Sequence, residues 1–384
     1  MIKKIQSLFS GFQKDNIIRL SVKNLDDLKY FNTAKQIFIC FQNQNYKLKL
    51  VGGCVRKLIT EEKIDDMDIA INIEPEKIKK VLVEQKIKFV ETGIKYGTIT
   101  ALINDFKFEI TSLRKDLSTD GRHAKVEFTS NWEQDAQRRD FTINAIYSDI
   151  SGEVYDPLNG IEDLKNGIIK FIGDPNQRIQ EDYLRILRYL RFYTQYNKNK
   201  FHDEIATKAI KRNLDGLAKI SRERILEELF KMMKLNNFSK LFEDEFCRFI
   251  ILSILPQLRN YNRIKILNKI SYKIKKQIDK ILLLSILIVD ETDNCNFFLY
   301  KYQLSNEDKK RILFIKNSFK NYSKQYLYSK KNLLKLTYLS DKLSVIELLI
   351  FSIFINPKKI SNIENLIDYI KEKAIPEFPI NAKF

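Results

Sequence analysis

The chain has 384 residues, 44% of them hydrophobic and 12% aromatic, which excludes a disordered protein and allows about two to four folded domains. Its 67 lysines and arginines outnumber its 49 aspartates and glutamates, and the formal charge of +18 favours nucleic acid as a partner. The longest apolar runs, at 281–289 and 345–355, are too short to span a bilayer. Four scattered cysteines without metal or disulfide spacing predict a reducing compartment, so we expect a soluble protein of a bacterial cytoplasm or of an organelle.

The first 150 residues alternate between helical and strand patterns, which predicts a mixed α/β domain. The expected elements, in chain order, are a helix over 24–44, a strand over 47–51, a helix from Cys54, a strand over 67–71, a helix over 75–84, and strands over 97–103 and 106–111. Pro75 suits a first helical turn, and Asn104-Asp105 is a hairpin signal between the last two strands.

The most informative motif joins a glycine pair to two aspartates. Gly52 and Gly53 let the backbone approach a triphosphate closely, and they lead into a helix N-terminus, where anions are favoured. Asp66 and Asp68 are two residues apart along a strand, so both point to one face and can hold two divalent cations. This geometry is typical of metal-assisted phosphoryl transfer.

Glu109 offers a third carboxylate for such a site. It alternates with Phe106, Phe108 and Ile110 along a strand, so we expect it on the face opposite the apolar one, free to join the two aspartates. A glycine turn, a solvated Asp-x-Asp loop and an exposed glutamate are each common without catalysis. Their order and spacing together favour the catalytic interpretation.

The segment 131–147 reads as a helix whose polar face carries Arg138, Asp140 and Asn144. A guanidinium can bind phosphate bidentately, and an aspartate can accept a hydrogen bond from a ribose hydroxyl. A salt-bridged surface helix is the alternative. After residue 150 the strand signals are limited to 153–155 and 168–172, and the remainder predicts helix after helix.

A further helix is expected over 181–191. On it Asp182 and Arg185 would lie side by side, with Arg188 and Arg191 winding round the same flank. A carboxylate accepts from the exocyclic amino group that cytosine and adenine share, while an arginine donates to the adjacent ring nitrogen. Uracil and guanine present the reverse pattern, so the array predicts selection of C and A without a nucleic-acid template. A plain ion pair would explain Asp182 and Arg185 alone.

From about residue 50 to about 231 the chain resembles the class II tRNA nucleotidyltransferases, the CCA-adding enzymes, whose head is shared with bacterial poly(A) polymerases. The motifs that carry the resemblance are, in order, VGGCVRK, DMD, FEITSLRKD, DGRHAKVEF, RRDFTINA, DPLNGIEDL, EDYLRILRYLRF and ISRERILEELFK. It implies an α+β protein: a polymerase-β-like head with a mixed sheet, followed by helical domains. The implied divisions are a catalytic head over 1–150, a nucleotide-selecting neck over 151–215, a body over 216–300 and a tRNA-binding tail over 301–384.

The resemblance also implies the reaction, which is addition of C, C and A to the 3′ end of tRNA from CTP and ATP. Asp66 and Asp68 would bind two Mg²⁺, and Glu109 would position or deprotonate the primer hydroxyl. The implied nucleotide-binding residues are Gly52, Gly53, Arg56, Arg138, Asp140, Asn144, Asp182, Arg185, Arg188 and Arg191. The segment 114–126 matches a mobile loop that helps the family switch from C to A, and Lys57 replaces the family's usual aspartate.

Beyond about residue 240 only composition points to RNA. Lysines recur at helical spacing over 265–276, and 309–335 holds nine basic residues and no acidic ones. Such faces suit RNA phosphates, and solvated lysines on an apolar helix are the alternative. The RNA-binding candidates are Lys265, Lys269, Lys273, Lys316, Lys320 and Lys324. We expect tRNA to be contacted at its acceptor and elbow regions by a monomer or homodimer without membrane association.

Two other kinds of function stay open. One is a poly(A) polymerase, or an enzyme that adds only CC or only A, on the same scaffold; the intact 114–126 segment argues against CC-only addition. The other is a non-catalytic RNA-binding protein that has kept the scaffold. The presence of Asp66, Asp68 and Glu109 together argues against that.

Overall fold

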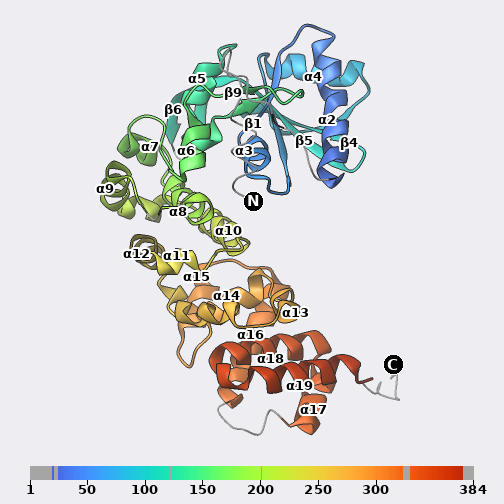
Figure 1. Ribbon diagram of the computed structural model, residues 1–384, viewed down its shortest axis with the longest axis vertical. Helices are drawn as coiled ribbons and strands as arrows, with labels where there is room; N and C mark the ends of the chain where they lie inside the picture. Colours follow the sequence, from blue (N-terminus) through green and yellow to red (C-terminus); the bar gives the residue numbers. More distant parts are fainter. Residues whose placement is uncertain (1–19, 21–24, 121–122, 200, 323–328, 375–384) are drawn as a thin grey trace, which may run out of the picture. The chain divides into compact units, whose positions relative to one another are not determined.

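The computed structural model describes residues 20, 25–120, 123–199, 201–322 and 329–374. The chain divides into two compact units, Met1–Gly216 and Leu217–Phe384. Figure 1 colours the chain by residue number, from blue at the N-terminus to red at the C-terminus. The first unit holds the strands, and the described part of the second is helical. The α+β class expected from the sequence is therefore confirmed.

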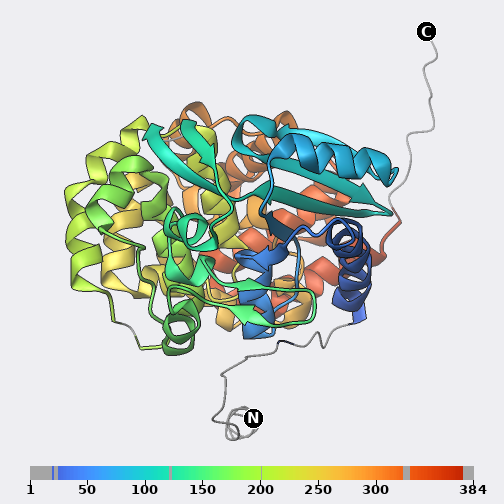
Figure 2. The ribbon, with the colours of Figure 1, turned by 90° about the horizontal axis from the view of Figure 1, so that it is seen from above.

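A seven-stranded sheet organises the first unit, with strand order β3-β4-β5-β2-β1-β8-β9. Its strands are β1 (Leu48–Val51), β2 (Met67–Ile71), β3 (Lys88–Gly93), β4 (Thr98–Ile103), β5 (Phe106–Ser112), β8 (Tyr147–Ser148) and β9 (Val154–Tyr155). β2 and β5 pair in parallel, and the other neighbours are antiparallel. A separate hairpin, β6 (Arg114–Asp120) and β7 (His123–Phe128), lies beside this sheet in Figure 2.

One face of the sheet is buried against helices α2 (Leu25–Gln42) and α4 (Pro75–Glu84), which Figure 1 shows beside β4 and β5. Inward-pointing residues of β2 and β5, such as Ile69, Phe108 and Ile110, join this core. The opposite face has a smaller apolar cluster near β1 and β8 that includes Val51, Ala70 and Tyr147. Alternation along each strand thus decides which side chains face the core and which face the opposite side.

The predicted elements of the first 112 residues are confirmed to within two residues at each end. The helix expected from Cys54 is α3 (Gly53–Thr60), and the expected hairpin turn contains Asn104 with a left-handed φ of +54°. Asparagine tolerates that conformation better than most residues, which explains why the turn signal was reliable.

The prediction of one continuous helix over 131–147 is wrong. The helix ends early, as α5 (Trp132–Gln137), and a 3₁₀ turn, η2 (Thr142–Asn144), precedes β8. The Asp140 carboxylate accepts hydrogen bonds from the Phe141 N–H and the Asn144 amide, so side chains compete with helical backbone bonds here. The strand predicted over 168–172 is reduced to one isolated bridge between Phe141 and Phe171.

The helix predicted over 181–191 is also interrupted. α7 (Pro175–Glu181) ends at Asp182, whose backbone is extended with a φ of −155°, and α8 (Leu184–Tyr196) then begins. The other helices of this unit are α6 (Gly160–Asn166) and α9 (Glu204–Arg212). Asp156 accepts from the N–H groups of Gly160 and Ile161 at 2.9 Å, so its turn is a structural joint at the start of α6.

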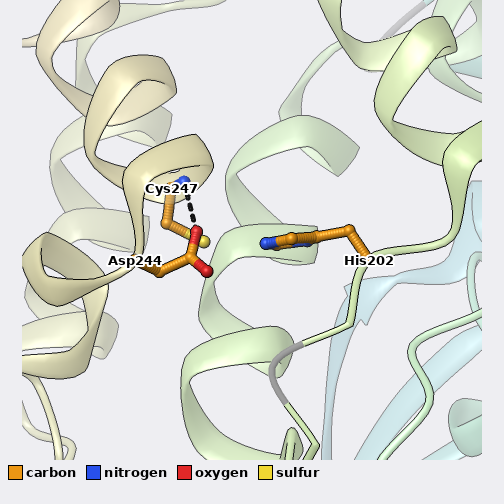
Figure 3. A group of neighbouring side chains, drawn as sticks. All are labelled: His202, Asp244 and Cys247. Atoms are coloured by element: carbon orange, nitrogen blue, oxygen red, sulfur yellow. Dashed lines mark hydrogen bonds between the residues drawn. The ribbon is translucent and has the colours of Figure 1, made fainter.

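The second unit is built from helices around an apolar centre. They are α10 (Arg222–Met233), α11 (Lys240–Glu243), α12 (Glu245–Ile254), α13 (Tyr272–Lys275), α14 (Lys280–Ile288), α15 (Asn294–Lys301), α16 (Asn306–Tyr322), α17 (Lys330–Leu339), α18 (Lys342–Ile355) and α19 (Ile360–Glu372). Every residue of α14 from Ile281 onward is buried. Polar caps begin many of these helices; the Asp244 carboxylate, for example, accepts from the Cys247 N–H at 2.8 Å, as Figure 3 shows.

No helix in the described ranges combines the length and apolar character that crossing a bilayer requires. Cys40, Cys54, Cys247 and Cys295 are free thiols in the structure.

Candidate active site

The three candidate carboxylates lie on or beside β2 and β5, two neighbouring strands at the centre of the sheet. In the parallel pair β2–β5, Asp68 is the register partner of Glu109, so the two side chains leave the same face on neighbouring strands. Asp66 comes one residue before β2 and is exposed, as is Glu109, while Asp68 is half-buried. The structure thus places Glu109 beside Asp68 and away from the apolar core.

The negative charges of this acidic cluster are not fully compensated by neighbouring positive charges. Burial and the nearby charge of Glu109 raise the pKa of Asp68 to about 6, although Arg139 and Arg56 oppose the shift. Carboxylates that raise one another's pKa favour a bound cation, and hard divalent cations such as Mg²⁺ take carboxylate oxygens as ligands. The donor set therefore suits divalent metal.

The glycine pair forms the start of α3. Gly52 has a φ of +69°, which L side chains rarely adopt, and its carbonyl accepts from the Arg56 N–H at 3.0 Å. No side chain caps the helix, and a Cβ built on Gly53 would meet no atom within 4 Å. The first backbone N–H groups of this helix therefore have no capping side chain, and Gly53 is partly exposed, as a phosphate site at a helix N-terminus requires.

A chain of polar contacts joins four of the predicted nucleotide-binding residues. The Arg56 guanidinium donates to the Asn144 amide oxygen, and the Asn144 amide donates to Asp140 at 2.8 Å. The second Asp140 oxygen accepts from Arg188 Nε at 2.5 Å. Burial alone would raise the pKa of Asp140, but Arg188 and the Asn144 hydrogen bond hold that pKa below its usual range. Arg56 itself packs under Phe192, 4.8 Å from the ring centroid.

Arg138 shares one acidic partner with its neighbour Arg139. Both guanidinium groups contact the carboxylate of Asp135, at 2.7 and 2.9 Å. Asp135 is 1% exposed and also accepts from the Tyr147 hydroxyl at 2.7 Å. Sequence reasoning missed Asp135 and Arg139, although their spacings of three and four residues along a short helix were a usable signal. Two arginines against one aspartate leave positive charge at the site.

Asp182 and Arg185 do not lie side by side on one helix, which corrects that expectation. The Asp182 carboxylate accepts from the Leu184 N–H at 3.1 Å, so it caps the start of α8. Arg185 instead donates to Glu181 at 2.6 Å and to the carbonyl of Arg178 at 2.5 Å. The cause is the interruption of the helix between Glu181 and Leu184, which leaves Asp182 just before the first turn of the helix that carries Arg185.

Arg188 and Arg191 follow Arg185 at steps of three along α8, as expected, but their guanidinium groups have different partners. Arg188 points to Asp140, whereas the Arg191 guanidinium stacks 4.1 Å from the centroid of the Phe192 ring. Arg178 was missed by sequence reasoning; it is 9% exposed and donates to the carbonyls of Arg138 and Arg139. Arg178 thereby ties α7 to the segment that follows α5.

The segment expected to be a mobile loop contains the β6–β7 hairpin, and its tip at 121–122 lies outside the described residues. Arg114, at the base of the hairpin, donates to the carbonyl of Tyr96. Lys57 forms an ion pair with Asp65 at 2.7 Å, one residue before Asp66 of the acidic cluster.

The RNA-binding candidates are scattered. The helical spacing expected over 265–276 is wrong, because η5 (Tyr261–Asn268) and α13 are separate short helices. Lys265 and Lys269 are exposed, whereas Lys273 is paired with Asp368 at 2.6 Å. Lys316 is buried and donates to Asn296, so it is not placed to contact phosphate. The Lys320 side chain and Lys324 lie outside the described part of the chain.

The sequence of the chain is similar to known protein families and to individual proteins. Residues 48–170 match the family model for the poly A polymerase head domain, and residues 203–260 match the model described as a probable RNA and SrmB binding site of polymerase A. A CCA-adding enzyme of Staphylococcus epidermidis is 32% identical over 287 residues, which cover 73% of this chain and 67% of that protein. The chain belongs to the CCA-adding tRNA nucleotidyltransferase family.

Other members of this nucleotidyltransferase family are similar over shorter stretches. The human mitochondrial CCA tRNA nucleotidyltransferase 1 is 46% identical over 209 residues, or 54% of this chain. The match covers 48% of that relative, so the chain spans about half of its length. Among solved structures, a Bacillus stearothermophilus CCA-adding enzyme in complex with CTP shares the fold, with a TM-score of 0.67, 23% identity and coverage of 89% of this chain and 81% of that one.

Proposed function

We propose that this chain is a template-independent nucleotidyltransferase that adds C, C and A to the 3′ end of tRNA from CTP and ATP. The observation that carries the proposal is the register of β2 and β5, which sets Glu109 beside Asp68 next to the uncapped N-terminus of α3. The proposal is supported by relatives whose names include CCA addition. It is also supported by structurally similar CCA-adding enzymes that were solved in complex with CTP, with ATP and with tRNA.

Asp66 and Asp68 would hold two Mg²⁺ ions through their carboxylate oxygens. When bound, such ions activate a hydroxyl nucleophile and stabilise the leaving pyrophosphate. Glu109, exposed on the neighbouring strand, would accept a hydrogen bond from the terminal ribose hydroxyl of the primer and orient that hydroxyl toward the α-phosphate. The three carboxylates therefore have different roles although they share one face.

The triphosphate would lie at the start of α3, where Gly53 leaves open space and Arg56 follows one turn later. Arg138 and Arg139 would add positive charge, since they share the single carboxylate of Asp135. Asp140 accepts three hydrogen bonds, from the Phe141 N–H, Asn144 and Arg188, so one acceptor position is left for a ribose hydroxyl.

Asp182 and Arg185 would read the base. They remain adjacent through the hydrogen bond from the Arg185 N–H to the Asp182 carbonyl, at 3.0 Å. Because Arg185 donates to Glu181 in this structure, we propose that a bound base takes over part of the Arg185 hydrogen bonding while Glu181 keeps the guanidinium in place. The second unit would contribute the tRNA contacts, with Lys265 and Lys269 as its exposed candidates.

The test uses the purified full chain with Mg²⁺, CTP, ATP and a tRNA that ends at the discriminator base, with products resolved by gel. Addition of three nucleotides is expected. A long ladder with ATP alone would indicate a poly(A) polymerase, addition of two nucleotides or one would indicate a partial enzyme, and tRNA binding without extension would indicate a non-catalytic RNA-binding protein.

A further inference from the structure

The sheet face that carries Glu109 continues beyond the acidic cluster, and the strand registers define which residues lie there. From β5 through β4 to β3, one row runs Glu109, Thr100 and Val90. Partners in an antiparallel pair leave the same face of the sheet, so this row continues outward from Asp68 on the next strand. Three interstrand steps of about 4.8 Å separate Asp68 from β3.

The rows on either side complete a three-strand surface. One consists of Lys107, Leu102 and Lys88, and the other of Thr111, Thr98 and Gly93. Apolar neighbours of these residues, such as Phe108 and Ile110, point into the core on the other face. We call the surface formed by these three rows the β3–β5 face.

The β3–β5 face is unlike the rest of its side of the sheet. Near β1 and β8 that side is covered by the apolar cluster of Val51, Ala70 and Tyr147. On the β3–β5 face, by contrast, Lys88, Lys107 and Glu109 are exposed, and Val90 keeps 50% of its surface accessible. Thr100 on the central strand is buried, so the exposed groups of this face lie on β3 and β5, and exposed basic and apolar side chains of this kind suit binding of a partner.

The polar groups on this face suit an RNA strand. Neither the Lys88 nor the Lys107 amine has an ion-pair partner among the residues that the structure describes, so both charges are available to phosphates. The half-buried Thr98 and Thr111 share a hydrogen bond at 3.0 Å, and the exposed Thr92 bonds the buried Thr100 at 2.9 Å, so the hydroxyls of Thr92, Thr98 and Thr111 keep acceptor positions at this surface. Such hydroxyls can accept from ribose 2′-OH groups, which RNA presents and DNA lacks.

We infer that the β3–β5 face binds the primer strand of the RNA, with the strand's 3′-terminal hydroxyl at Glu109 and its preceding phosphates at Lys107 and Lys88. The inference rests on the proposed function, because it takes the primer to be the strand extended at Asp68 and Glu109. Two facts select this occupant: the face is continuous with the acidic cluster, and its two lysines complement a polyanion.

The experiment compares two double variants of the full chain that remove the same charge. Lys88→Ala/Lys107→Ala strips the β3–β5 face, and Lys77→Ala/Lys80→Ala strips exposed lysines of α4, which covers the other side of the sheet. Affinity for tRNA lacking its CCA end is measured from 50 to 300 mM salt. The first variant should bind roughly tenfold more weakly and lower the slope of log K against log salt by about 1.5, with the KM for CTP unchanged.

The control variant should match the wild-type chain in affinity, slope and KM, and thermal melting should show all three proteins equally folded. In addition, a photoreactive nucleotide at the primer 3′ end should cross-link to peptides within 88–111. Equal affinities and slopes for the two double variants would overturn the inference, as would cross-links confined to other peptides or a change in oligomeric state without a change in RNA affinity. A wild-type chain that adds no nucleotide would instead defeat the proposed function.

Discussion

Asp68 in the first unit and Glu347 in the second are both carboxylates withdrawn from water, yet their neighbours differ in sign. Burial raises the pKa of each, but the next contribution at Asp68 comes from another carboxylate, Glu109, whereas at Glu347 it comes from the guanidinium of Arg311. Arg311 also pairs with Asp279 at 2.8 Å. Glu347 is thus neutralised by the protein itself, while Asp68 is not.

The difference teaches how to separate structural from functional charge in this chain. An acidic cluster that the fold leaves unneutralised costs stability, so it persists where a ligand compensates it. A neutralised acid, such as Glu347 or the arginine-bound Asp135, is explained by the folded chain alone. Substitutions at the two kinds of acid test whether this distinction holds.

The largest effect is expected for Asp68→Asn, because the amide removes the charge that would hold divalent metal. We expect nucleotide incorporation to fall roughly a thousandfold or more, with tRNA affinity unchanged. The matched control is Asp65→Asn, which alters a carboxylate three residues earlier that is exposed and paired with Lys57. Single-turnover assays measure both. Comparable losses in the two variants would remove the distinction between the acidic cluster and ordinary surface acids.

Glu347→Gln should act on stability instead of chemistry. The change leaves Arg311 with only its more exposed partners, so we expect the free energy of unfolding to fall by about 3 kcal/mol. Urea unfolding followed by circular dichroism checks this, with Glu372→Gln, an exposed acid at the end of α19, as the control. Incorporation at low temperature should stay close to that of the unmodified chain. A stable variant would show that Glu347 is not needed to balance Arg311.

The same contrast explains what could be predicted from the sequence. On the sheet, side-chain direction alternates with a period of two, so the pattern around Phe108 and Ile110 predicted the face of Glu109. Where polar side chains bind the backbone, periodicity fails: Asp140 ends the predicted helix, and Asp182 interrupts the next one. Pairing across long separations, as between Arg188 and Asp140, leaves no local signal.

A smaller effect is expected for Asp182→Ala, which tests whether Asp182 reads the base or merely caps α8. Loss of a base-reading carboxylate should reduce discrimination of CTP over UTP by roughly 10- to 100-fold, in line with about 1–3 kcal/mol per bidentate pair. Loss of a cap alone would lower stability by about 1 kcal/mol without changing nucleotide choice. Asp182→Ser separates the two, since serine can keep the cap. Unchanged selectivity in both variants would count against base reading.

The smallest effect concerns the two adjacent glycines, which the structure separates into a conformational and a binding role. Gly52→Ala places a Cβ at a φ of +69° and should cost about 1 kcal/mol of stability. Gly53→Ala should leave the unfolding midpoint in place, because its Cβ would meet no protein atom within 4 Å.

The open space at Gly53 is nevertheless where we propose that the triphosphate lies, so the same alanine should raise the KM for CTP and ATP severalfold. Chemical denaturation of both variants gives their stabilities, and steady-state kinetics gives their KM values for CTP and ATP. If Gly53→Ala lowered stability as much as Gly52→Ala and left both KM values unchanged, the space beside α3 would not be a phosphate site, and the glycine pair would be a turn and nothing more.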